Sequence, residues 1–335
     1  MLAVVKDKAA PGVVLKDVPK PIPQKDEVLV KVKYASICGT DIGIYDWIPW
    51  AASHIHPSKI IGHEMVGEVI EINSDKETKI KPGDLVSSET HIYCLNCYQC
   101  EIKNYHVCEN MQLFGIGRNG AFAEYATIPL KTTWKNDPSI DPEVMSVQEP
   151  LGNAVNVVTK AEVKDKRVLI MGLGPTGLCA GGAAKAYGAK EIVGINDEPY
   201  RRELADKTGW FDRTEEKLDP SEYNSYDVVL EMSGNRLGIE IAFEAVRIAG
   251  KLIAFGIPKE NISVDWGKFM INKELSIESV FGRQIWKTWH QTTELLKSGK
   301  VDLKKIITHH FPLKDFEQAM AVMKSRKAGK IVLEP

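Results

Sequence analysis

The chain has 335 residues, of which 44% are hydrophobic and 26% are charged, and its formal net charge is −2. This length allows two domains that each bury a core, and the composition is that of an ordinary globular protein. A charge so close to zero provides no basic surface for nucleic acid. The most apolar stretch, residues 168–184, is broken by glycines and a proline, which argues against a membrane span. We therefore expect neither a nucleic acid nor a membrane as a partner.

The cysteine content and the first residues indicate a cellular compartment. The chain begins "MLAVVKDKAAPG", and the charge at Lys6 comes too early for a secretory signal. The chain has six cysteines. Structural disulfides are rare in the cytosol, so we expect a cytoplasmic protein with reduced thiols.

Residues 1–150 predict a domain of β-strands. Short runs such as "EVLVKVKYASI" (27–37) and "IIGHEMVGEVIEI" (60–72) alternate in polarity and are separated by Pro, Gly and Asp. This pattern is typical of an all-β, barrel-like domain. Within it, "ICGTDIGIYDW" (37–47) contains Cys38, which could be a buried thiol, half of a disulfide, a nucleophile or a metal ligand. The residues alone favour the buried thiol, because free cysteine usually behaves as a small apolar side chain.

Four further cysteines lie within fifteen residues, in "CLNCYQCEIKNYHVC". The spacing C-x2-C-x2-C-x7-C lets several thiolates converge on one ion, and disulfides between such close neighbours would be strained. A structural zinc ion fits best, with an iron–sulfur cluster or unmetallated thiols as alternatives. The ligands would be Cys94, Cys97, Cys100 and Cys108. The remaining cysteine, Cys179, lies among Ala and Gly and is expected to be buried.

A glycine-rich turn follows a predicted strand at residues 168–171 and precedes a predicted helix. Gly172, Gly174 and Gly177 match G-x-G-x-x-G, and a second strand at 192–195 completes a βαβ unit. Glycines let the backbone approach a pyrophosphate, which the helix N-terminus then faces. Asn196 stands where an acid usually binds the ribose of NAD, so the sequence favours NAD over NADP only slightly.

The remaining predicted elements extend this pattern into a doubly wound parallel sheet. Strands are expected within 227–234 and 251–258, and an amphipathic helix between them is expected to run from 236 to 250. Helices are predicted near 292–299 and around Phe316, Met320 and Met323, followed by a strand at 330–335. We expect a first domain at 1–150, a nucleotide-binding domain at 151–290, and a return to the first domain at 291–335.

Together the motifs resemble the zinc-dependent medium-chain alcohol dehydrogenases over the whole chain. The shared features are "CGTD", "GHE", the four-cysteine loop, "GAFAEY" and the glycine turn, and the longer motifs "EPLGNAV", "LEMSG" and "FGRQIWKTW" resemble the threonine dehydrogenases. The resemblance implies an α/β protein with a GroES-like β-barrel catalytic domain, a Rossmann domain and a homotetrameric assembly. It implies oxidation of a small-molecule secondary alcohol by NAD or NADP. A polyol or aldose dehydrogenase, and a non-catalytic dinucleotide-binding sensor, are the alternatives.

The resemblance also assigns roles to individual residues. Cys38, His63 and Glu64 would bind a catalytic zinc ion, the four-cysteine loop would bind a second, and Glu149 would lie beside the catalytic ion. Thr40 would take the proton of the alcohol, and His91 would lie near the substrate. Arg283 and Trp286 would lie at a subunit contact or a cofactor edge. The implied cofactor contacts are Gly172, Gly174, Thr176, Gly177, Asn196, Arg201, Phe255, Gly256, Ile257, Val280 and Phe281.

One position departs from the family pattern. Relatives carry a histidine three residues after the threonine, as the next member of the proton relay, whereas this chain has Gly43. Without an imidazole that titrates near neutral pH, the proton must leave through Glu149, water or another histidine. The candidates are His91, His54 and His56, of which the last two are expected at the surface.

Overall fold

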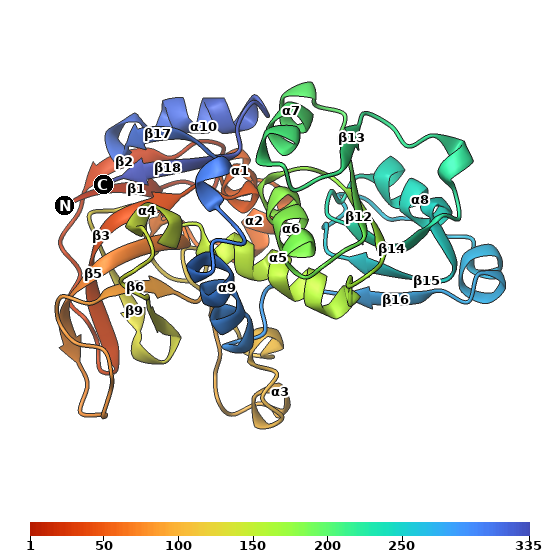
Figure 1. The fold of residues 1–335 in the computed structure, drawn as a ribbon. Coiled ribbons are helices and arrows are strands. Elements are labelled where there is room, and N and C mark those ends of the chain that lie inside the picture. The colour runs from red at the N-terminus through yellow and green to blue at the C-terminus, as the bar shows by residue number, and fades with distance from the viewer. The chain divides into compact units, whose positions relative to one another are not determined.

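The computed structural model describes residues 1–335, and the chain divides into two compact units (Figure 1). The first unit consists of residues 1–149 and 307–335, and the second consists of residues 150–306. No helix has both the length and the apolar character that a membrane span requires.

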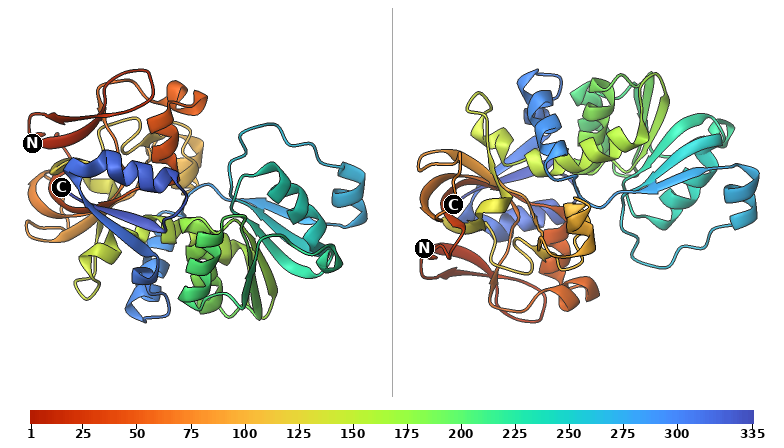
Figure 2. Two further views of the ribbon diagram at one scale, coloured as in Figure 1. Left: turned by 90° about the horizontal axis from the view of Figure 1, so that it is seen from above. Right: turned by 90° about the horizontal axis from the view of Figure 1, so that it is seen from below.

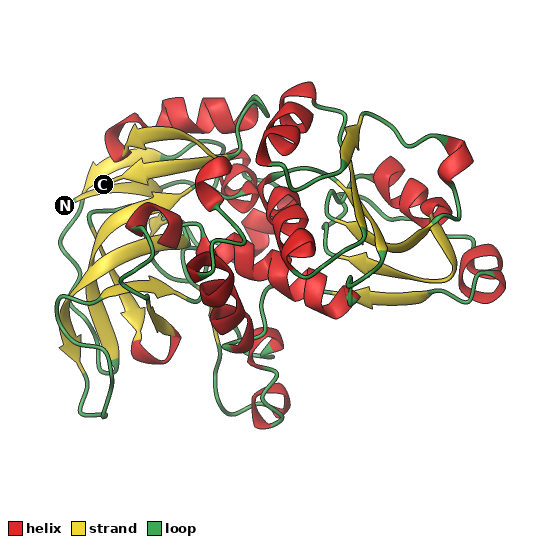
Figure 3. Cartoon of the chain, in the orientation of Figure 1, coloured by secondary structure: helices red, strands yellow, loops and turns green.

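The first unit is rich in strands, which Figure 3 shows in yellow. Its largest sheet has the order β10-β6-β5-β3-β18-β17, and β9 also pairs with β3. A second sheet has the order β2-β1-β4, and β7 pairs with β8. The strands are β1 (Leu2–Lys6), β2 (Val14–Asp17), β3 (Glu27–Ser36), β4 (Lys59–Ile60), β5 (Glu64–Asn73), β6 (Leu85–Ser88), β7 (His91–Ile92), β8 (Gln112–Leu113), β9 (Tyr125–Pro129), β10 (Thr133–Lys135), β17 (Ile307–Pro312) and β18 (Lys330–Glu334).

Both ends of the chain build this unit. The last strand, β18, pairs antiparallel with β3, so the C-terminal segment, blue in Figure 2, lies in the same sheet as an N-terminal strand. The side chains of Phe316, Met320 and Met323 are buried on one face of α10, as the sequence predicts, and join the core of this unit. The helices of the unit are α1 (Gly39–Asp46), α2 (Pro49–His54), α3 (Tyr98–Glu101), α4 (Pro142–Met145) and α10 (Phe316–Lys324).

The second unit contains a six-stranded parallel sheet of order β13-β12-β11-β14-β15-β16. Strands β11, β12 and β14 are mostly buried, largely apolar runs, as expected when helices cover both faces of a parallel sheet, whereas the edge strands β13 and β16 are polar and more exposed. Its elements are β11 (Arg167–Met171), α6 (Pro175–Ala186), β12 (Glu191–Ile195), α7 (Pro199–Thr208), β13 (Arg213–Glu215), β14 (Tyr226–Glu231), α8 (Arg236–Ala245), β15 (Val246–Ala254), β16 (Ser276–Ser279) and α9 (Lys287–Lys297). Helix α5 (Gln148–Ala161) begins at the end of the first unit and continues into the second.

The predicted helix between β14 and β15 is shorter than the sequence pattern indicated. We expected it to end at Gly250, but α8 ends at Ala245 and β15 begins at Val246. The buried ammonium of Lys273 lies 2.7, 3.0 and 2.9 Å from the carbonyl oxygens of Phe243, Glu244 and Val246. These carbonyls sit at the end of the helix and need partners, so a lysine from far along the chain determines where the helix ends.

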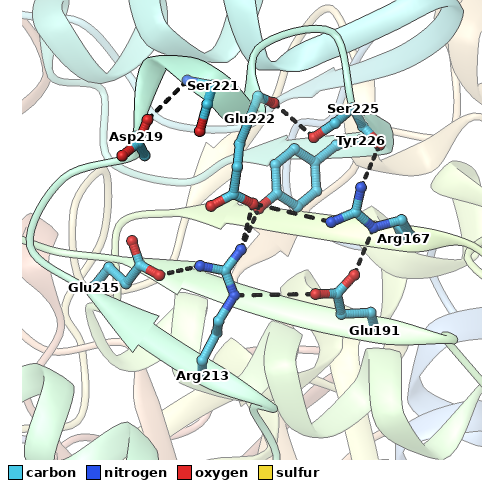
Figure 4. A network of polar contacts seen from close by, with 9 residues as sticks. All are labelled: Arg167, Glu191, Arg213, Glu215, Asp219, Ser221, Glu222, Ser225 and Tyr226. Atoms are coloured by element: carbon cyan, nitrogen blue, oxygen red, sulfur yellow. Dashed lines mark hydrogen bonds and ion pairs between the residues drawn. The ribbon is translucent and has the colours of Figure 1, made fainter.

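A network of charged side chains lies by the first strands of this sheet (Figure 4). Arg213 binds Glu215 and Glu222, and its guanidinium lies 3.0 Å from the hydroxyl of Tyr226. Arg167 donates a 2.5 Å hydrogen bond to Glu191. Arg167, Glu191 and Tyr226 begin β11, β12 and β14, so the network gathers near the amino ends of the strands, away from the glycine turn.

Candidate active site and metal centres

The three predicted zinc ligands come from the ends of two paired strands. Cys38 follows β3 and is the N-cap of α1, while His63 and Glu64 lie at the start of β5, where Glu64 is opposite Ser36. Gly62 makes this approach possible: its φ is +90°, and a Cβ there would lie 2.2 Å from the Phe122 ring. The "GHE" motif therefore needs its glycine to place the next two side chains.

The structure brings these ligand atoms together. The ligand atoms of Cys38, His63 and Glu64 all lie within 4.8 Å of one another. His63 and Glu64 are buried, and His63 Nδ1 and Glu64 Oε1 have no hydrogen-bond partner. A buried polar atom without a partner costs free energy, so the orphaned Glu64 Oε1 indicates a missing ligand. The thiolate, imidazole and carboxylate donors suit zinc, and three protein ligands leave a coordination position open.

A second layer of buried charges surrounds this cluster. Glu64 Oε2 is bound by both Ser36 and Lys330, and the Lys330 ammonium also donates a 2.9 Å hydrogen bond to the carbonyl of Ile37. Lys330 is fully enclosed; burial lowers its pKa, but the charge of Glu64 outweighs this and raises it overall. The Oε2 atom of Glu64 is thus engaged by protein groups, and its Oε1 atom remains for a metal.

Asp41 holds the cysteine and faces the histidine. Its Oδ2 accepts a 2.8 Å hydrogen bond from the backbone N–H of Cys38, and its Oδ1 lies 3.8 Å from His63 Nδ1. Complete burial raises the pKa of Asp41 to about 6. Burial alone would lower the pKa of His63, but the charges of Asp41 and Cys38 raise it to about 10. A carboxylate behind a metal-binding imidazole fixes the orientation of the ring.

The predicted proton-transfer and substrate residues lie in the same unit. Thr40 Oγ1 is 3.8 Å from Cys38 Sγ. Glu149 is buried, and its Oε1 accepts a 3.2 Å hydrogen bond from Thr90. His91 is also buried, and its Nδ1 lies 2.9 Å from Glu89 Oε1.

The position that lacks the family histidine is filled by another side chain. A Cβ added to Gly43 would lie 2.9 Å from Cδ1 of Ile48, so the isoleucine occupies the start of the space that an imidazole would need. His54 and His56 are exposed, as expected.

The four-cysteine loop forms a second cluster of ligands. The Sγ atoms of Cys94, Cys97, Cys100 and Cys108 lie within 4.8 Å of one another. None of these cysteines forms a disulfide. Hydrogen bonds, the largest from the backbone of Asn96, lower the pKa of Cys94 to about 6, whereas burial raises that of Cys108 to about 12. Four thiol ligands suit a closed tetrahedral zinc site.

The predicted cofactor residues gather at the carboxyl edge of the parallel sheet in the second unit. Gly172 follows β11, Asn196 follows β12, Phe255 follows β15 and Val280 follows β16. The glycine turn is tightly closed, since a Cβ on Gly177 would lie 2.0 Å from the carbonyl oxygen of Gly172. In open α/β sheets, this edge is where dinucleotides bind.

Comparisons with known proteins agree with this architecture. Residues 24–138 match the family described as the alcohol dehydrogenase GroES-like domain, and residues 175–298 match the zinc-binding dehydrogenase family. L-threonine 3-dehydrogenase from Pyrococcus abyssi is 43% identical over 341 residues, covering 99% of this chain and 98% of the relative. The enzyme of that name from Caldanaerobacter subterraneus is 43% identical over 350 residues, covering 100% and 99%.

Solved structures share the fold. The alcohol dehydrogenase from Thermus sp. ATN1 is 26% identical with a TM-score of 0.88, and galactitol-1-phosphate dehydrogenase from Escherichia coli is 25% identical with a TM-score of 0.90. Each alignment covers all of both chains. The chain belongs to the zinc-dependent medium-chain alcohol dehydrogenase family. The predicted fold class, an α/β protein with GroES-like and Rossmann domains, is confirmed.

The structure also places other residues of this dehydrogenase that were expected at the cofactor or at a subunit contact. Thr176 lies in the first turn of α6, and Arg201 Nη1 would be 3.8 Å from a Cβ on Gly174. Arg283 is buried and donates a 2.9 Å hydrogen bond to Asn153 of α5. Ile257 and Phe281 are exposed by 79% and 51%, so both offer apolar surface near the carboxyl edge of the sheet.

The sequence did not predict the residues behind the candidate metal ligands. Lys330 and Ser36 bind Glu64, and Asp41 faces His63, yet none of the three was expected to act in the site. Asp41 belongs to the "CGTD" motif, so its position three residues after Cys38 could have indicated a role beside the candidate metal site. Lys330 lies 266 residues from Glu64, and no local pattern connects the two.

Proposed function

We propose that this chain is an L-threonine 3-dehydrogenase, which oxidises L-threonine to L-2-amino-3-oxobutanoate while a hydride passes to NAD+ and a proton is released. The observation that carries the proposal is the convergence of Cys38, His63 and Glu64 beside Thr40. This set stands in a chain that aligns almost end to end with relatives of that name.

Each of the chain's own residues has a part in this reaction. Cys38, His63 and Glu64 would hold a zinc ion, which supplies a Lewis acid that makes the substrate hydroxyl more acidic. The Thr40 hydroxyl can accept that proton and donate its own, because a hydroxyl is both donor and acceptor. Glu149 and Thr90, joined by a hydrogen bond, offer the next acceptor in place of the missing histidine at Gly43.

The buried charges of the first unit favour a substrate that carries an ammonium group. Asp41, Glu64, Glu89 and Glu149 are all buried carboxyl groups, and Lys330 is the buried ammonium that pairs with Glu64. A bound zinc ion would offset part of this charge, but with the Cys38 thiolate included the site stays negative. A polyol has no positive group to meet such a field, whereas zwitterionic threonine can direct its ammonium group towards these carboxyl groups.

We infer that NAD is the cofactor, with NADP as the alternative. Asn196 is buried at the end of β12, and its Oδ1 accepts a 3.2 Å hydrogen bond from the backbone N–H of Glu198. This leaves the amide N–H groups to face a ribose hydroxyl. We also propose two zinc ions per chain, one in each ligand cluster. The homotetramer and the cytoplasmic location stay predictions from the family resemblance.

A panel of substrates tests the proposed function. Reduced nicotinamide is measured with L-threonine, 3-hydroxybutyrate, sorbitol, xylitol and glucose, with NAD+ and NADP+ in separate assays. 3-Hydroxybutyrate is threonine without the ammonium group, and we expect its kcat/KM to be lower by at least about a hundredfold, the size of discrimination seen when a buried charge loses its partner. A higher kcat/KM with sorbitol or xylitol would instead identify a polyol dehydrogenase. No turnover with any alcohol, despite cofactor binding, would favour a sensor.

A further inference from the structure

A carboxylate is buried at the cofactor edge of the second unit, and none of the roles described above uses it. Glu231 is the last residue of β14, and its side chain is 3% exposed. Strand β14 lies between β11, which leads into the glycine turn, and β15, which leads to residues 255–257.

Glu231 joins two of the loops at this edge. Its Oε1 accepts hydrogen bonds from the backbone N–H of Ser233 at 2.9 Å, from the Ser233 hydroxyl at 2.5 Å and from the N–H of Gly234 at 3.1 Å. Its backbone carbonyl accepts hydrogen bonds from the N–H groups of Phe255 and Gly256, each at 3.0 Å. The loop after β14 and the loop after β15 are therefore fastened to the same residue.

The glycine turn packs against this same point. A Cβ on Gly172 would lie 2.8 Å from Cβ of Ser233. A Cβ on Gly256 would lie 2.1 Å from the backbone nitrogen of Gly234 and 2.6 Å from Glu231 Oε2. The loops after three neighbouring strands thus meet around one carboxylate, and glycines permit the close approach.

The charge of Glu231 has no cationic partner in the chain. Its carboxylate partners are the hydroxyl of Ser233 and backbone N–H groups, and no ion pair includes it. Burial raises the pKa of Glu231 overall, and the hydrogen bonds from Ser233, Gly234 and Gly256 offset only part of this rise. Partners that all donate hydrogen bonds suit the charged form. Buried charges in proteins are usually paired, so this unpaired anion indicates that a cation lies near it in the working enzyme.

We propose that Glu231 is a positioning residue of the cofactor site, whose carboxylate holds the three loops together and favours the cationic oxidised nicotinamide over the neutral reduced ring. The proposal rests on the proposed function, and it takes the nicotinamide end of the cofactor to lie by Phe255, Gly256 and Ile257, whose contacts with the cofactor the family resemblance implies. Hydride transfer removes the positive charge of the ring. The attraction of Glu231 is therefore lost when the cofactor is reduced, and release of the reduced form becomes easier.

Binding titrations of the full chain test this role. The dissociation constants of NAD+ and NADH are measured for the natural protein, for Glu231→Gln and for Glu240→Gln. Glu240 is an exposed residue of α8, and its substitution removes the same unit of charge without touching the loops. We expect Glu231→Gln to weaken NAD+ binding about tenfold more than NADH binding, the scale of effect that one charge has on a close neighbour. Glu240→Gln should leave the ratio of the two constants unchanged.

The outcomes separate this inference from the proposed function. If the natural protein binds neither NAD+ nor NADH, the proposed function fails. If it binds both and Glu231→Gln keeps the natural ratio, the inference fails alone. Should Glu231→Gln not fold, Glu231→Asp decides, since it keeps the charge but shortens the side chain. If Glu231→Asp binds both NAD+ and NADH more weakly, and the ratio of the two dissociation constants stays within about twofold of that of the natural protein, the positioning role is supported. If Glu231→Asp binds both as tightly as the natural protein does, the positioning role is overturned.

Discussion

A single buried ion pair prepares the candidate zinc site for its metal. Lys330 and Glu64 are 1% and 0% exposed, and they come from opposite ends of the chain. Taking two charges out of water is costly, so such a pair adds little to net stability but is expensive to break. Because the lysine and Ser36 occupy one carboxylate oxygen, Glu64 can offer a zinc ion its other oxygen in a fixed direction.

We expect Lys330→Met to destabilise the metal-free protein by about 3–5 kcal/mol, because it leaves the Glu64 carboxylate buried without its partner. The free energy of unfolding is measured in urea after chelation. Lys327→Met, which removes an exposed lysine three residues away, should have almost no effect. Adding Glu64→Gln to Lys330→Met should recover part of the loss, and strict additivity of the two changes would contradict the pairing.

The absence of an imidazole at position 43 is another single-residue feature with a measurable consequence. We expect Gly43→His combined with Ile48→Ala to raise kcat by roughly tenfold above pH about 6.5, where a neutral imidazole can accept the proton. The second change makes room, because the Ile48 side chain occupies the space next to Gly43. The measurement is the pH profile of kcat, with Ile48→Ala alone as the control. An unchanged profile would show that the proton leaves by a route in which position 43 has no part.

At the scale of elements, the charged network of the second unit connects neighbouring strands. Glu222 receives hydrogen bonds from Arg213 and Tyr226. Burial by itself raises the pKa of Glu222, but these partners lower it below its ordinary value of 4.5. Since the unfolded chain then takes up a proton more readily than the folded one, the stabilisation is present above the ordinary pKa. It is lost as the pH falls through the lowered folded-state pKa.

Glu222→Gln should therefore cost about 2 kcal/mol of stability at pH 7, the usual value for hydrogen bonds to a charged group. The difference from the natural protein should shrink as the pH falls below 4.5. Urea unfolding at a series of pH values checks this. Glu216→Gln, at an exposed neighbouring glutamate, is the control and should show no such slope. A difference that stays constant down to pH about 3 would rule out linkage to Glu222.

The elements also show what could be predicted from the sequence. Strands β11, β12 and β14, the glycine turn and the four-cysteine cluster were predictable, because their signals lie in contiguous residues. Cys38, His63 and Glu64 do not lie together in the sequence, and only the family resemblance assigned them to one site. The end of α8 was not, because Lys273 caps its carbonyls from 27 to 30 residues away. Lys330 was missed for the same reason, and because lysines are rarely buried. Local patterns thus predict elements and ligands, whereas long-range contacts determine where elements end and how ligands are held.

At the scale of the whole molecule, the chain crosses between its two units twice, at residues 149–150 and 306–307. The first unit therefore depends on the last residues of the chain. Phe316 of α10 is 2% exposed, and its ring lies 5.4 Å from that of Phe122, measured between centroids. Phe122 in turn packs on Gly62, the residue before His63. The C-terminal helix thus supports the candidate zinc site through two contacts.

Because the candidate zinc ligands lie in one unit and the predicted cofactor residues in the other, we expect the two units to respond separately to their ligands. Phe316→Ala should destabilise the first unit by about 3–5 kcal/mol, the usual cost of removing a buried phenylalanine. In calorimetry, this change and chelation should each lower the transition of the first unit. NADH at a hundred times its Kd should stabilise the second unit by about 2.7 kcal/mol and so raise the transition temperature of that unit. A single transition that responds equally to Phe316→Ala, to chelation and to NADH would show instead that the molecule unfolds as one cooperative body, and that the zinc and cofactor sites are energetically coupled.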